Sequence, residues 1–92
     1  ARGCMAHVDC VGWAGCRCWF WSRDHLEPHF HVKSPGEWEI RVFFGDQPPR
    51  YEVEFEARKV PRRALRKFLA VVAEHRERLF EEWAAKVQVE DK

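Results

Sequence analysis

At 92 residues the chain has the length of one small domain, and its 46% hydrophobic and 34% charged residues argue against a disordered protein. The 16 Lys and Arg nearly balance the 15 Asp and Glu, so the net charge of +1 argues against nucleic-acid binding through overall charge and leaves that role to a local patch. No apolar run is long enough to cross a bilayer, so we expect no membrane partner.

The first fifteen residues have weak periodicity and three glycines, which predicts a poorly ordered segment over 1–15 with a short strand at 8–11. Met5 is the only methionine, so one hypothesis is that residues 1–4 precede the natural start. This segment shows no signal-peptide pattern. We therefore expect a cytoplasmic protein.

The four cysteines lie in the first fifth of the chain, in a C-x5-C-x5-C-x-C spacing that lacks the CxxC pair of many zinc sites. We interpret Cys4, Cys10, Cys16 and Cys18 as incidental thiols of a reduced protein. The alternative is a metal site that combines a cysteine with the histidines further along the chain.

A single α+β domain is predicted over 16–88. Segments rich in strand-forming residues, or with apolar residues at alternate positions, predict a four-stranded antiparallel meander over 16–22, 29–33, 37–44 and 51–57. The apolar side chains expected on its inner face are Phe30, Val32, Trp38, Ile40, Val42, Phe44, Tyr51, Val53, Phe55 and Ala57.

The turn at 34–36 suggests a register for the second and third strands of this meander. A three-residue loop pairs Val32 with Trp38 on the inner face. On the other face it pairs His31 with Glu39 and His29 with Arg41. The same reasoning places Arg41 near Glu54 on the last strand.

One long C-terminal helix is predicted to begin at Pro61, a residue favoured in the first turn, and to pack on one face of the sheet. It extends to about Gln88. Its apolar stripe consists of Leu65, Phe68, Leu69, Val72, Leu79, Phe80 and Trp83.

Histidines and an aspartate gather between residues 24 and 31. His29 and His31 stand two residues apart on a predicted strand, so both imidazoles project from one face and can chelate one cation. The candidate metal ligands are Asp24, His25, His29, His31 and Glu39, with zinc as the expected divalent metal. The alternative is a solvated polar face with His–Glu pairs. For catalysis the candidates are His25, His29, His31 and His75. For His75, which lies at the edge of the helix stripe, a structural role as an imidazole hydrogen-bonded to the sheet is the usual outcome.

The start of the helix is strongly basic: six of the ten residues at 58–67 are Lys or Arg and none is acidic. Cations at this end oppose the helix dipole, so local stability does not explain them. A basic helix N-terminus suits phosphate or carboxylate groups, and the predicted anion-binding residues are Arg58, Lys59, Arg62, Arg63 and Arg66. The alternative is a surface that is solvated or is partly neutralised by Glu52, Glu54 and Glu56.

Two motifs resemble a known family. The sequence Asp24-His25-Leu26-Glu27-Pro28-His29-Phe30-His31 and the ending His75-Arg76-Glu77-Arg78-Leu79 with Trp83 are similar to the bacterial family called domain of unknown function 4160 (DUF4160). That family has a DH-x-P-P-H-x-H core and an H-R-x-x-L-x-x-x-W helix, and Glu27 replaces a common proline here. The resemblance covers about residues 16 to 87. It implies gene pairs of toxin–antitoxin type and no defined activity.

Three functions are therefore considered. The first is a small binding or regulatory protein of toxin–antitoxin type, whose basic helix start engages RNA or a small cognate antitoxin-like protein. The second is a ribonuclease that uses His25, His29 and His31 as metal ligands or acid/base groups. The third is a structural metal site without catalysis.

Overall fold

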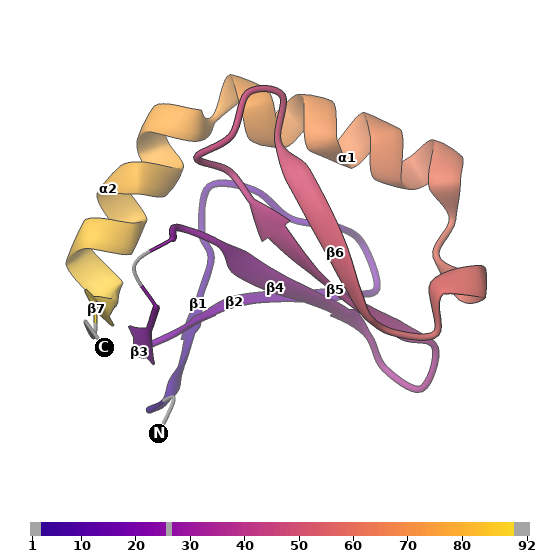
Figure 1. The fold of residues 1–92 in the computed structure, drawn as a ribbon, viewed down its shortest axis with the longest axis horizontal. Coiled ribbons are helices and arrows are strands. Elements are labelled where there is room, and N and C mark those ends of the chain that lie inside the picture. The colour runs from indigo at the N-terminus through magenta and orange to yellow at the C-terminus, as the bar shows by residue number, and fades with distance from the viewer. Residues whose placement is uncertain (1–2, 26, 90–92) are drawn as a thin grey trace.

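The sheet has five antiparallel strands in the order β1-β2-β4-β5-β6, in a computed structural model that describes residues 3–25 and 27–89. A small parallel pair, β3 with β7, lies at one end (Figure 1). The strands are β1 (Met5–His7), β2 (Arg17–Trp21), β3 (Arg23–Asp24), β4 (Phe30–Ser34), β5 (Trp38–Phe43), β6 (Arg50–Phe55) and β7 (Gln88–Val89). The helical elements are the 3₁₀ turn η1 (Ala57–Lys59), α1 (Arg62–Glu74) and α2 (Arg76–Lys86).

The fifth strand comes from the N-terminal segment, so the prediction of four strands was wrong. Strand β1 lies at Met5–His7 rather than at 8–11, and it pairs antiparallel with β2. Val8 and Val11, which follow it, are buried in the core at 1% and 6% exposure. The residues around Val8 and Val11 do not show the alternation of apolar and polar side chains typical of a strand, because the chain leaves the sheet immediately after β1.

The predicted inner face of β4 and β5 is confirmed, but the predicted register of this hairpin was wrong. Phe30, Val32, Trp38, Ile40, Val42 and Phe44 are all buried. However, Val32 pairs with Ile40 and His31 with Arg41, two residues away from the expected partners. Strand β4 continues through Ser34, and Gly36 adopts a positive φ of 75° in the turn. A slip of two residues keeps every side chain on its face, so alternation in the sequence cannot detect it.

Strand β6 departs from the prediction at its end. Val53 and Phe55 are 36% and 52% exposed instead of lying in the core, and Ala57 belongs to η1. Strand β6 is the edge strand of the sheet, and its register with β5 shifts between Glu39 and Ile40. The predicted proximity of Arg41 to Glu54 is confirmed by an ion pair of 2.7 Å.

Two helices replace the single helix that the periodicity predicts. The helical path breaks at His75, whose φ of −106° and ψ of 21° are not helical, and its N–H is shared between the carbonyls of Val71 and Val72. Figure 1 shows α1 and α2 meeting at a bend on one side of the sheet. Five residues of the predicted stripe are buried there: Leu65, Phe68, Val72, Leu79 and Trp83. Neither helix has an apolar stretch of the length that a bilayer crossing needs.

Candidate functional site

Asp24 and His29 meet where β3 ends and β4 is about to begin. The Oδ2 atom of Asp24 lies 3.2 Å from Nε2 of His29. The other carboxylate oxygen accepts the backbone N–H of His25 at 2.8 Å. On the far side of the imidazole, Nδ1 of His29 lies 2.9 Å from the carbonyl oxygen of Glu27. The His29 ring is therefore held between two oxygen atoms from the chain just before it.

His31 lies beside this pair and is almost completely buried. Its ring stacks on Trp19, with centroids 5.2 Å apart, and Nδ1 lies 3.7 Å from Oε2 of Glu39. His29 in turn stacks on Phe43 at 5.1 Å. The two histidines are 3% and 2% exposed, so the alternative of a solvated polar face was wrong. The apolar–polar alternation of the strand predicts a face exposed to water, but Trp19 and Phe43 lie against the two histidines and exclude water from them.

Three of the five predicted metal ligands converge. Asp24, His29 and His31 each offer one ligand atom, and these atoms all lie within 4.8 Å of one another. His25 is exposed and outside the group. Glu39 is also outside the group, although it approaches His31 diagonally across the hairpin. Within residues 3–25 and 27–89, this is the one group of three or more acidic, histidine or cysteine side chains with such spacing.

The surroundings keep the Asp24 carboxylate ionised. Burial by itself raises the pKa of this group. Hydrogen bonds from His29 and from the backbone N–H of His25 outweigh burial, and the pKa of Asp24 falls below its ordinary value. A buried anion next to two imidazoles is the combination of charge and donor type that binds a divalent cation.

His75 is not part of this group but forms the joint between α1 and α2. Its Nδ1 atom lies 2.9 Å from the carbonyl oxygen of Val71. The next residue, Arg76, donates to the carbonyl oxygens of Phe44 at 3.2 Å and Gly45 at 2.9 Å. The His-Arg motif therefore positions the two helices on the end of β5. Arg76 is not among the site residues predicted from sequence, although its place beside His75 in the helix motif was a usable signal.

The predicted anion-binding residues are all exposed, at η1 and in the first turns of α1, and are here called the basic surface: Arg58, Lys59, Arg62, Arg63 and Arg66. None of these five side chains forms an ion pair with another described residue. The glutamates of β6, which the sequence offered as neutralising partners, pair with Arg41 and Arg50 instead. Arg62 and Arg66 also line a cavity of about 110 Å³ with Tyr51.

Comparison with known families decides the membership of the chain. The model of the family described as "Domain of unknown function (DUF4160)" matches residues 15–84. The chain belongs to the DUF4160 family. No curated protein and no solved structure matches it. The matched span includes the Asp24–His29–His31 group, the basic surface and the His75–Arg76 joint.

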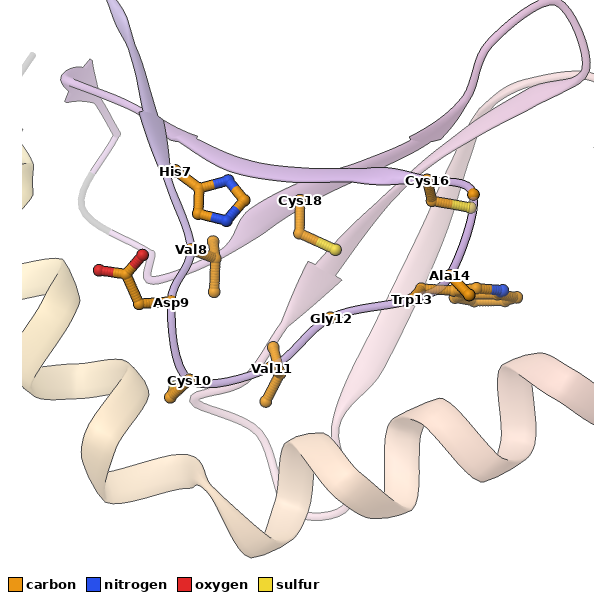
Figure 2. A pocket seen from close by; sticks show the side chains of 11 residues that line it. His7, Val8, Asp9, Cys10, Val11, Gly12, Trp13, Ala14, Cys16 and Cys18 are labelled. Carbon is orange, nitrogen blue, oxygen red and sulfur yellow. The ribbon is translucent and has the colours of Figure 1, made fainter.

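A second hollow of this DUF4160 protein, of about 540 Å³, lies mainly before the matched span. Figure 2 shows His7, Cys10, Cys16 and Cys18 around it. Burial, together with the neighbouring Glu82 carboxylate, raises the pKa of the Cys10 thiol to about 11, and burial raises that of Cys18 to about 12. These thiols stay protonated at neutral pH, and all four cysteines are free.

The described cysteines also stand outside the Asp24–His29–His31 group, so the structure does not bring them to the histidines as the mixed metal site requires.

Proposed function

We propose that this DUF4160 protein is a binding component of a toxin–antitoxin-like module that engages RNA through its basic surface. The observation that carries the proposal is the set of five exposed cations at residues 58–66 without an ion-pair partner among the described side chains. In a chain of net charge +1, such a concentration leaves local positive charge for an external anion.

The backbone adds to the positive charge of the basic surface. Helix α1 begins at Arg62 after Pro61, has no acidic residue in its first turn and has no side-chain cap. The first backbone N–H groups of a helix have no partner within the helix, and they point toward solvent at its positive end. Arginine side chains and free N–H groups together suit phosphate oxygens.

The hollow at Tyr51 supports RNA rather than a protein partner. Arg62 and Arg66 flank an aromatic ring and two leucines, Leu65 and Leu69. Single-stranded nucleic acids combine phosphates with flat bases, and proteins bind them with cations beside aromatic surfaces. A small acidic antitoxin-like protein is the alternative partner for the same surface.

The test is a salt titration of binding to a labelled single-stranded RNA, followed by fluorescence anisotropy. The triple variant R62A/R63A/R66A should bind at least tenfold more weakly, with a salt dependence reduced by about 0.7 in slope for each lost phosphate contact. The control R17A/R23A/R78A removes the same charge from three exposed arginines elsewhere and should bind nearly as tightly as the parent.

Equal losses of RNA affinity in the two triple variants, or an RNA affinity that does not change with salt concentration, would contradict the RNA proposal. Binding to an acidic protein with no binding to RNA would favour the alternative partner.

The ribonuclease hypothesis has weaker support in the geometry. His29 and His31 are 3% and 2% exposed, so a phosphodiester cannot contact their rings in this arrangement. His25 is exposed, but it stands outside the histidine–aspartate group. Incubation of the same RNA with the protein, with and without a chelator, tests this hypothesis directly, since cleavage that is lost in the H25A variant would revive it.

A further inference from the structure

We propose that Asp24, His29 and His31 bind one Zn²⁺ ion, which fastens the β3 end of the chain to the main sheet. This inference does not depend on the RNA proposal, because none of the three side chains is among the five residues of the basic surface. Three observations carry it: the two oxygen atoms that face the His29 ring, the spacing of the ligand atoms and the burial of the two histidines.

The His29 ring faces an acceptor on each side. Its Nδ1 lies 2.9 Å from the Glu27 carbonyl oxygen, and its Nε2 lies 3.2 Å from the Asp24 carboxylate. A neutral imidazole carries one N–H and can satisfy one of these oxygens. A protonated ring can donate to both oxygens. In the neutral tautomer whose Nδ1–H donates to Glu27, Nε2 carries a lone pair beside the Asp24 carboxylate, so one cation can bind both atoms.

His29 has the support that metal-ligating histidines usually have. Such a histidine donates its second N–H to a carbonyl or carboxylate oxygen, which orients the ring and increases its basicity. For His29 this oxygen belongs to the backbone of Glu27. Near His31, the Oε2 atom of Glu39 lies 3.7 Å from Nδ1, which is longer than a hydrogen bond. Glu39 therefore faces His31 from outside the ligand group.

The spacing of the ligand atoms fits a small tetrahedral ion. Zinc binds nitrogen and oxygen at about 2.0–2.1 Å, so two ligand atoms of a tetrahedron lie about 3.3 Å apart. The Asp24–His29 distance of 3.2 Å already has this value, and all three ligand atoms lie within 4.8 Å. The fourth zinc position falls to a water molecule.

The location of the group indicates a structural use. Asp24 ends β3, whose strand pairing is with β7, whereas His31 lies within β4 of the main sheet. An ion held by Asp24 and His31 joins the end of β3 to the main sheet. The histidines are 3% and 2% exposed, which favours stabilisation over catalysis on a large substrate.

The experiment is titration of chelator-treated, metal-free protein with Zn²⁺ by calorimetry, together with thermal unfolding. We expect one ion per chain and an increase in Tm of about 10–20 °C at a free Zn²⁺ concentration 100 times the Kd. Co²⁺ should give a tetrahedral visible spectrum without a thiolate charge-transfer band, because the cysteines are not ligands.

Two conservative variants and one control make the result specific. D24N and H31Q keep the side-chain size and should weaken Zn²⁺ binding at least tenfold, and circular dichroism checks that they fold. H25A, which alters the exposed neighbouring histidine, should leave affinity and stoichiometry unchanged. Three results would overturn the proposal: no binding of Zn²⁺ at one ion per chain, a Zn²⁺ affinity of D24N and H31Q equal to that of the parent protein, or a thiolate band in the Co²⁺ spectrum.

Discussion

The backbone N–H of Asp9 donates to Oε1 of Glu82 at 2.8 Å and so ties the N-terminal segment to α2. The second carboxylate oxygen of Glu82 accepts the N–H of Cys10 at 2.7 Å. Lys86, one turn later, completes the connection by donating to the carbonyl oxygen of His7 and to Asp9. A segment that precedes the family match is therefore attached to the helix by charged hydrogen bonds.

Removal of this attachment should destabilise the protein. The variant E82A leaves the N–H groups of Asp9 and Cys10 without their acceptor and deprives Lys86 of an ion-pair partner. We expect a loss of about 1–3 kcal/mol in the free energy of unfolding, measured by urea denaturation. E81A, at the exposed neighbouring position, is the control and should change it by less than about 0.5 kcal/mol. Similar losses in both variants would contradict this role of Glu82.

Acid should weaken the same attachment. Burial raises the pKa of Glu82, but hydrogen bonds from Asp9, Lys86 and Cys10 outweigh it and lower the pKa from 4.5 to about 2. A carboxyl with a depressed folded-state pKa stabilises the protein fully above its unfolded pKa, and this contribution is lost as the pH falls through the folded value. Between about pH 4.5 and pH 2, stability should therefore fall more steeply in the parent than in E82Q. Parallel pH profiles of Tm would show that Glu82 does not contribute.

The joint between the helices should depend on Arg76. Its guanidinium donates to two backbone carbonyls, those of Phe44 and Gly45, and lies 5.1 Å from the Phe80 ring. R76A leaves these carbonyls without their donor, and we expect a loss of about 1–3 kcal/mol. R78A removes an equal charge from an exposed position on the same helix and should be nearly neutral. Chemical denaturation of the two variants compares them directly.

Two phenylalanines that both belong to the predicted inner face should respond differently to truncation. Phe44 is 0% exposed and packs among aromatic rings, so F44A should cost about 3–5 kcal/mol. Phe55 is 52% exposed at the end of the edge strand, so F55A should cost about 1 kcal/mol or less. Equal destabilisation in the two unfolding curves would restore the interpretation from sequence, in which both side chains lie in the core.

The sequence by itself determined the α+β class, the buried face of β4 and β5 and the apolar stripe of the helices. These follow from side-chain periods of 2 and 3.6, which depend on local backbone geometry alone. The HxH spacing also placed His29 and His31 on one face of β4, because residues two apart in a strand share a face.

Only the tertiary structure decided the fifth strand, the register of the β4–β5 hairpin, the bend at His75 and the choice of site residues. Strand β1 belongs to the sheet because it pairs with β2, and its segment is tied to Glu82 by a hydrogen bond that spans 73 residues of the chain. His29 and His31 are buried because Trp19 and Phe43 lie against them from neighbouring strands. Asp24 joins them and His25 does not, because Asp24 ends β3, whose position depends on its pairing with β7 near the other end of the chain rather than on any sequence period.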